Sequence, residues 1–251
     1  MKALAILLLL NVAAADPRLA VGLDEHVGAR IPLDTPLTDT TGRATTLRSL
    51  LAPDRPIILA LAYARCEMLC SVVLRALADA VRAHPGPDYL PVVVSLDPDE
   101  TADEGARRQN RLLDDIGRAG QRAAWPYLVG DAPAIAELAN ALGFRYAWDP
   151  ETRQFAHPAV VFVLTPDGRI AEYLRGVTFV DSLPLALVRA RAGELTPSTA
   201  RDLLTCFHFD PTLRRREHQL RLVFQLGAAL VLFTLAAMIA GLVAWERRRL
   251  R

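Results

Sequence analysis

An uninterrupted apolar segment at residues 56–63 and a second one at 89–96, interrupted by a single serine, are the feature that most restricts how this 251-residue chain folds. A strand that is apolar at every position must be covered on both faces, which is typical of a central strand in a parallel sheet. Each of them is followed by a segment with helical spacing, and we expect four such helices: 71–82, 101–116, 131–142 and 182–192. This alternation predicts an α/β fold, a mostly parallel sheet with helices on both faces.

Shorter signals complete the pattern. Residues 39–42 (Asp-Thr-Thr-Gly) indicate a hairpin turn ahead of the first buried strand, and residues 126–129 indicate a short strand. Residues 159–164 and 169–175 have the composition of two strands, which the turn sequence Thr-Pro-Asp-Gly at 165–168 joins into a hairpin. The expected sheet therefore ends in a strand hairpin, and the last helix follows it.

The two ends of the sequence predict export and membrane attachment. Lys2, an apolar run and three alanines before Asp16 form the pattern of a secretory signal that is removed. Near the other end, 24 consecutive residues carry no charge, and at about 1.5 Å per residue such a helix crosses a hydrocarbon core of about 30 Å. We therefore expect five parts: a signal peptide (1–15), a folded domain (16–195), a juxtamembrane linker (196–221), a transmembrane helix (222–245) and a cytoplasmic tail (246–251). This arrangement predicts a single-pass protein of a bacterial-type inner membrane, with its domain in the periplasm.

Composition excludes several classes of function. Lys and Arg number 29 against 28 for Asp and Glu, so no net charge attracts nucleic acid. The only lysine is Lys2, within the predicted signal peptide, which excludes Schiff-base chemistry and phosphate-loop nucleotide hydrolysis. Three cysteines are too few for a disulfide scaffold. We expect local cysteine chemistry, with neither a nucleic acid nor a small-molecule substrate as partner.

Cys66 and Cys70 lie between the first buried strand and the helix after it, at the edge of the sheet where α/β proteins bind ligands. If the helix begins near Cys66, both sulfurs lie on one face of its first turn. There the helix dipole favours thiolates and lowers the thiol pKa. Two neighbouring thiolates suit Cu(I), or they close into a disulfide outside the cytoplasm. The alternative is a pair of buried cysteines that pack as small apolar side chains.

A copper ion held by two sulfurs usually takes a third ligand, and imidazole is the expected one. His157 immediately precedes Pro158 and the apolar strand 159–164. In thioredoxin-like folds a cis-proline opens the corresponding strand and faces the cysteine loop. If Pro158 is that proline, His157 lies next to Cys66 and Cys70. The other interpretation is a histidine in a surface loop, as we expect for His26 and His84.

These motifs resemble the Sco/SenC family. The resemblance is carried by Y-x-R-C-x-x-x-C at 63–70, V-V-V-S-L-D-P at 92–98 and V-F-V-L-T-P-D-G-R at 161–169, within residues 27–193. Members of this family are thioredoxin-fold copper chaperones, anchored in membranes, which assist assembly of the binuclear copper (CuA) centre of cytochrome c oxidase subunit II. The resemblance implies the same fold, copper as the metal, and that subunit as the partner.

The resemblance also implies roles for individual residues. The copper ligands of the family fall on Cys66, Cys70 and His157, and a family aspartate near the site falls on Asp97, which we expect to fix the loop rather than bind metal. Met68 lies between the cysteines, and we expect it to fill space rather than to act as a ligand.

A subset of relatives also carries a cysteine and a histidine ahead of a terminal span. Here Cys206 and His208 either form a secondary metal contact or recruiting site, or pack the linker onto the domain.

Four functions remain open from the sequence. The first is a copper chaperone without turnover, which holds either trigonal Cu(I) or, with an added donor, a tetragonal Cu(II) ion. The second is a thiol–disulfide oxidoreductase, in which Cys66 attacks a partner and Cys70 resolves the mixed disulfide. The third, a peroxidase of the peroxiredoxin class, needs Thr or Ser three residues before the reactive cysteine, where this chain has Tyr63. The fourth is a structural domain tethered to a membrane.

Overall fold

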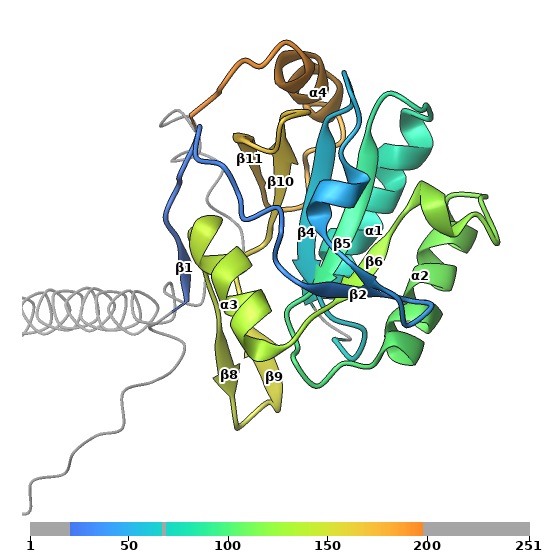
Figure 1. Cartoon of the computed structure of the whole chain (residues 1–251), viewed down its shortest axis with the longest axis vertical. Helices are drawn as coiled ribbons and strands as arrows, with labels where there is room; N and C mark the ends of the chain where they lie inside the picture. The colour runs from blue at the N-terminus through green and yellow to red at the C-terminus, as the bar shows by residue number, and fades with distance from the viewer. Residues whose placement is uncertain (1–20, 67–68, 198–251) are drawn as a thin grey trace, which may run out of the picture. The chain divides into compact units, whose positions relative to one another are not determined.

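The computed structural model describes residues 21–66 and 69–197 (Figure 1). Contacts divide the chain into two units, 1–208 and 209–251, and all described residues belong to the first. Within the described ranges no helix is both long and apolar enough to span a bilayer. The predicted signal peptide, transmembrane helix and cytoplasmic tail lie outside these ranges, and the five predicted parts of the chain stay predictions.

A seven-stranded sheet forms the centre of the domain, in the order β11-β10-β4-β5-β6-β2-β3. Two further pairs, β1 with β7 and β8 with β9, lie outside it. The strands are β1 (Gly22–Leu23), β2 (Leu37–Asp39), β3 (Ala44–Thr45), β4 (Ile57–Ala62), β5 (Leu90–Ser95), β6 (Tyr127–Val129), β7 (Phe144–Arg145), β8 (Ala147–Asp149), β9 (Gln154–Ala156), β10 (Val160–Leu164) and β11 (Ile170–Arg175). The helices are α1 (Leu69–Ala83), α2 (Ala102–Asp115), α3 (Ala132–Ala141) and α4 (Leu183–Arg191), with short 3-10 turns η2 (Leu47–Leu50) and η3 (Arg122–Ala124).

The predicted α/β fold is confirmed, but its parallel part is smaller than expected. Only the neighbours β4, β5 and β6 run parallel, whereas β10 pairs antiparallel with both β4 and β11. The reason is the route of the chain after α3. Instead of crossing directly into another parallel strand, it forms β7 and the β8–β9 hairpin, and it then enters β10 from the edge of the sheet where β4 ends.

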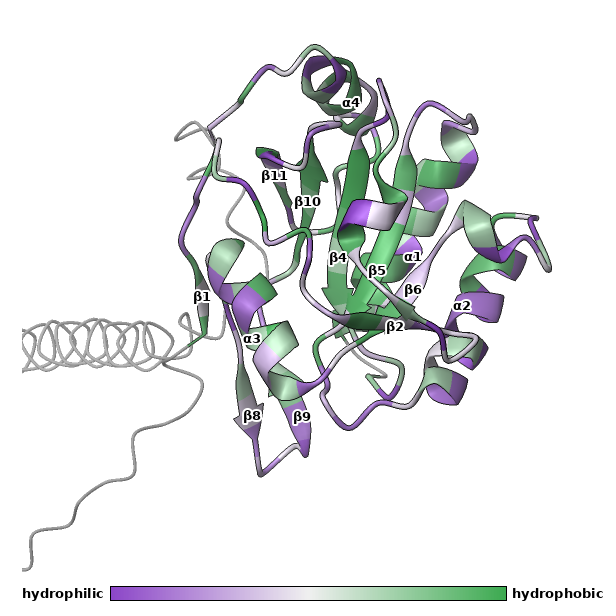
Figure 2. Cartoon of the chain, viewed as in Figure 1, coloured by the Kyte–Doolittle hydropathy of each residue, from purple (hydrophilic) through white to green (hydrophobic). Residues whose placement is uncertain are grey.

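The core matches the apolar pattern of the sequence. Every residue of β4, β5 and β10 is buried, and these strands form the hydrophobic centre in Figure 2. Helices lie on both sides of the strands in Figure 1, so both faces of the sheet are covered. Side chains cap the start of two helices: Thr101 forms a capping box with Glu104, and the Asp131 carboxylate accepts from Ala134 N–H. These caps fix where the loops at the carboxyl edge of the sheet end.

Candidate metal centre

The two cysteines of the motif lie side by side at the end of β4. Cys66 follows that strand in a short loop, and Cys70 lies in the first turn of α1. The backbone N–H of Cys70 donates to Cys66 Sγ at 3.3 Å. Both side chains are buried, with exposed fractions of 3% and 0%, and no disulfide joins them. The loop thus presents two thiols that point at the same small volume.

His157 reaches the same volume from the connection between β9 and β10. Its Nε2 lies 2.8 Å from Cys70 Sγ, and the ligand atoms of Cys66, Cys70 and His157 all lie within 4.8 Å of one another. Its Nδ1 lies 3.0 Å from the carbonyl oxygen of Pro158. Because a carbonyl only accepts, Nδ1 carries the proton, and the lone pair of Nε2 faces the sulfurs. The prediction that the fold brings this imidazole beside the two cysteines is confirmed.

The predicted reason for this position is wrong. No peptide bond in the described residues is cis, so Pro158 follows His157 through a trans bond. Antiparallel pairing places the histidine instead: Phe162 of β10 lies opposite Leu59 of β4, so the start of β10 lies beside the end of β4. A parallel β10 would begin at the opposite edge of the sheet, far from the cysteine loop.

Burial controls the electrostatics of the site. It raises the pKa of the Cys70 thiol well above its ordinary value, and the hydrogen bond and charge of Cys66 raise it further. Arg108 acts in the opposite direction with a smaller effect. The expected lowering of the thiol pKa at a helix N-terminus is therefore wrong for Cys70. A metal ion must displace the proton of this thiol in order to bind.

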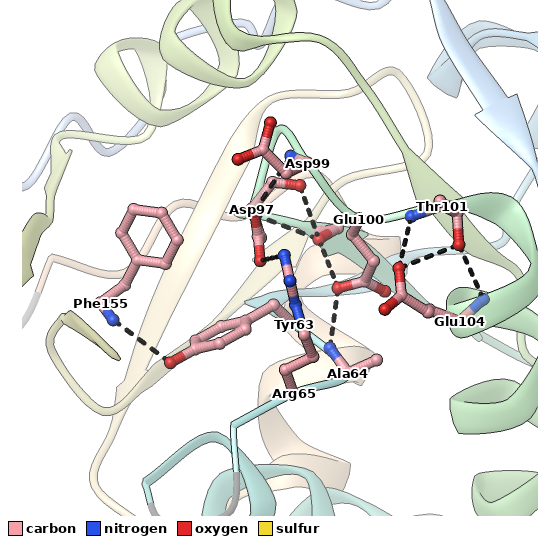
Figure 3. Close-up of polar contacts among 10 residues, drawn as sticks. Tyr63, Ala64, Arg65, Asp97, Asp99, Glu100, Thr101, Glu104 and Phe155 are labelled. Carbon is pink, nitrogen blue, oxygen red and sulfur yellow. Dashed lines mark hydrogen bonds and ion pairs between the residues drawn. The ribbon is translucent and has the colours of Figure 1, made fainter. Parts of the chain in front are cut away.

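Glu100 anchors the cysteine loop through its carboxylate, a role that sequence reasoning missed. Its carboxylate is buried and accepts from the backbone N–H of Ala64 at 2.7 Å and from the hydroxyl of Ser95 at 2.9 Å (Figure 3). Burial raises the pKa of Glu100, although these two donors act against the rise. The only signal in the sequence was the position of Glu100, three residues after Asp97 and directly before Thr101, which caps α2.

A second anchor holds the loop at Cys66. The hydroxyl of Ser71 donates to the carbonyl oxygen of Cys66 at 2.7 Å, and Arg108 of α2 donates to that hydroxyl at 3.1 Å. This chain of contacts links the metal loop to two helices. Sequence reasoning missed it as well, because nothing in the local pattern predicts that α2 reaches the first turn of α1.

Asp97 lies where a loop-fixing residue is expected. Its carboxylate, only 6% exposed, pairs with Arg65 at 2.5 Å and accepts from Asp99 N–H at 3.0 Å (Figure 3). It is not part of the three-residue metal group found among the described residues. Met68, Cys206 and His208 lie outside the described residues, so their predicted roles are not tested.

The donor set of the cluster favours a soft cation. Two thiol sulfurs and one imidazole suit trigonal Cu(I), whereas structural zinc takes four ligands. Within residues 21–66 and 69–197 the cluster offers three donors of the usual metal-ligating types. All three residues are buried, so a bound ion would be held away from bulk water.

Comparisons with known proteins agree with this geometry. The profile of the SCO1/SenC family matches residues 30–184. A similar solved structure is that of an Aquifex aeolicus VF5 protein with a suggested role in electron transfer: 27% identity, TM-score 0.58, covering 67% of this chain and 95% of that one.

Two copper-bound structures share the fold. ScoI of Arabidopsis thaliana has 20% identity and a TM-score of 0.53, covering 66% of this chain and 98% of that one. ScoI of Bradyrhizobium japonicum has 20% identity and a TM-score of 0.52, covering 64% and 99%. No curated protein matches the chain. Because the family profile covers more than half of the sequence, this protein belongs to the SCO1/SenC family.

Proposed function

We propose that this protein is a copper chaperone that binds one copper ion through Cys66, Cys70 and His157 and delivers it to the CuA site of cytochrome c oxidase subunit II. The observation that carries the proposal is the convergence of two sulfurs and Nε2 within 4.8 Å. Support comes from the family, two members of which are known with copper bound.

The chemistry of loading follows from the state of the ligands. In the structure the cysteines are thiols, and His157 Nε2 offers a lone pair to the cluster. Binding of Cu(I) forms two sulfur–copper bonds and one nitrogen–copper bond, and each thiol that becomes a thiolate releases a proton to solvent. No electron moves in this step, so delivery is an exchange of ligands and involves no turnover.

Location is the second part of the proposal. We infer an exported domain held at a bacterial-type inner membrane by one span, with the copper site in the periplasm. The support is the signal pattern at residues 1–15 and the uncharged stretch at 222–245. Protease treatment of spheroplasts tests it: digestion of the domain is expected, and protection would place the domain in the cytoplasm.

Copper stoichiometry tests the ligand set. The purified chain is loaded with Cu(I) under reducing conditions, and bound copper is counted for Cys66→Ser, Cys70→Ser and His157→Ala. We expect about one equivalent for the wild type and a large loss in each variant. His84→Ala is the matched control, because it replaces a histidine that is not part of the three-residue cluster. Full retention of copper by His157→Ala would overturn the three-ligand site.

A thiol–disulfide oxidoreductase is the second candidate, which the closeness of the two sulfurs favours. In that reaction Cys66 and Cys70 give two electrons and two protons to a disulfide of the partner and form a disulfide with each other. His157 has no required role in this exchange. If His157→Ala loses copper but still reduces the disulfide of an oxidised CuA domain, the chain carries both activities; if it loses neither, the redox function is favoured.

A further inference from the structure

A cavity of about 590 Å³ lies beside the metal centre, between the cysteine loop and the β8–β9 hairpin. We call it the hairpin cavity, and it is lined by Tyr63, Arg65, Asp99, Trp148, Arg153 and Phe155, together with the carboxylate of Asp97. Its volume is in the range that accepts a group of side chains or a small molecule. The proposed function assigns no role to it.

One side of the hairpin cavity is aromatic. Trp148 packs edge-on against Phe155 with ring centres 5.0 Å apart, and Phe155 packs edge-on against Tyr63 at 5.5 Å. Tyr63 is buried, but Trp148 is 47% exposed. A half-exposed tryptophan at the rim of a cavity, backed by other rings, is the type of residue that dominates protein–protein interfaces.

Two arginines and two aspartates line the cavity. Arg65 is 53% exposed, whereas the carboxylate of Asp97 that pairs with it is 6% exposed. Arg153 is exposed and has no ion-pair or hydrogen-bond partner within residues 21–66 and 69–197. Asp99 is the only lining carboxylate at an exposed residue. Because the Asp97 carboxylate neutralises Arg65, Arg153 is the lining cation that is left to pair with a carboxylate of a partner.

The walls of the cavity belong to the segments that carry the metal ligands. Arg65 directly precedes Cys66, and Phe155 comes two residues before His157. The Phe155 N–H donates to the hydroxyl of Tyr63 at 3.2 Å, which ties the hairpin to the cysteine loop (Figure 3). A protein seated in the cavity therefore contacts both segments that hold the ligands.

We propose that the hairpin cavity is the docking surface for the protein that receives the copper. The recipient places an apolar side chain against Trp148 and Phe155 and a carboxylate against Arg153. This inference rests on the proposed function, and it adds the surface through which the recipient is recognised and the chemistry of the recipient's matching face.

The experiment compares transfer of Cu(I) from the loaded full chain to two acceptors. One acceptor is the apo CuA domain of cytochrome c oxidase subunit II, and the other is the small chelator bicinchoninate, which needs no docking surface. For Trp148→Ala and Arg153→Glu we expect transfer to the CuA domain to slow by about tenfold, the size of effect seen at interface hot spots. We expect transfer to bicinchoninate and the copper stoichiometry to stay unchanged.

Two controls match these variants elsewhere on the domain. Val188→Ala removes an apolar side chain that is 66% exposed on α4, at the end of the domain away from β8 and β9 in Figure 1. Arg43→Glu reverses an exposed charge between β2 and β3, at the β3 edge of the sheet. Both are expected to transfer copper to either acceptor at the wild-type rate. Raising the salt concentration should slow the wild type more than Arg153→Glu.

The outcomes separate this inference from the proposed function. Wild-type rates to the CuA domain for both Trp148→Ala and Arg153→Glu would overturn the docking surface and leave copper binding intact. Equal slowing toward bicinchoninate would also overturn it, because the effect would then lie within the metal centre. A wild-type chain that binds no copper would overturn the proposed function and this inference together. A wild-type chain that loads bicinchoninate but not the CuA domain would exclude that domain as the recipient.

Discussion

Glu100→Ala provides a sharp test of how the fold supports the metal loop. The substitution removes the acceptor of the partly buried Ala64 N–H, two residues before Cys66. An unsatisfied buried N–H costs about 1–3 kcal/mol. Ser95 loses one partner but keeps the carbonyl oxygen of Asp97 at 3.4 Å. Adding about 1 kcal/mol for the vacated space, we expect the free energy of unfolding to fall by about 2–4 kcal/mol.

Glu100→Gln is the matched variant, because an amide oxygen still accepts from Ala64 N–H. We expect it to lower the free energy of unfolding by less than about 1 kcal/mol at neutral pH. Its copper stoichiometry should equal that of the wild type. Glu100→Ala should bind copper more weakly, because the loop before Cys66 loses its anchor.

The two variants also separate the charge of Glu100 from its hydrogen bonds. Burial raises the pKa of Glu100 in the folded protein, so the native state binds this proton more tightly than the unfolded chain. Its contribution to stability is therefore fully present below the unfolded glutamate pKa of about 4.3, and it is lost as pH rises through the higher folded value. Glu100→Gln has no titrating proton at this position. As pH rises through that window, the free energy of unfolding of the wild type should therefore fall relative to that of Glu100→Gln.

Urea unfolding of the purified chain, followed between about pH 4 and pH 8, measures both effects. Other titrating groups are common to the wild type and Glu100→Gln, so their contributions cancel in the difference. Two results would refute the reasoning. One is a Glu100→Gln variant as unstable as Glu100→Ala, and the other is a difference from wild type that does not change with pH.

Three further predictions follow from the same contacts. Burial raises the pKa of Cys70, so this thiol is protonated in the metal-free protein. The affinity for Cu(I) should therefore rise roughly tenfold per pH unit for each proton released. Competition with a chelator measures this affinity, and an affinity that does not change with pH would contradict the prediction. Tyr63→Phe deletes the acceptor of the Phe155 N–H, so hydrogen exchange of that amide should become faster. The free energy of unfolding should fall by about 1 kcal/mol. Unchanged exchange would show that this hydrogen bond does not join the hairpin to the cysteine loop. Gly143 has a φ of 61°, and a Cβ there would overlap the carbonyl of Asp24. Gly143→Ala should therefore lower the free energy of unfolding by about 3 kcal/mol or more. Thermal unfolding measures this, and a melting temperature equal to that of the wild type would show that the backbone relaxes.

The apolar pattern was enough to predict the elements but not their directions. The segments 56–63 and 89–96 became β4 and β5, and the turn at 165–168 joins β10 to β11 as expected. Periodicity contains no information about which way a strand runs in a sheet. The expected parallel sheet was therefore right for β4, β5 and β6 and wrong for β10, whose direction depends on the short strands β7 to β9 before it. These three strands have only two or three residues each, and none of them left a pattern in the sequence.

In the candidate site, too, the contacts between residues close in the sequence were predictable, and most contacts between distant residues were not. Cys66 and Cys70 are four residues apart, so local spacing sufficed to place them together. His157 was expected beside them, but through a cis bond at Pro158 that the structure does not contain. The pKa of Cys70 was predicted in the wrong direction, because helix-end electrostatics are local, whereas burial depends on the whole core. Glu100 was missed for a related reason: its partner Ala64 is 36 residues away in the sequence.

The burial that holds a copper ion also determines how the ion leaves. Cys66, Cys70 and His157 are each less than 5% exposed, so a recipient cannot contact all three ligand atoms from solvent. A trigonal ion bound by these three donors still has room for one more ligand. In the proposed delivery, ligand exchange begins when a donor of the recipient binds the ion from the side of the hairpin cavity, whose walls include the segments next to Cys66 and His157. When the Cys70 thiolate leaves the metal, its raised pKa favours taking up a proton, which opposes rebinding of the ion and favours transfer.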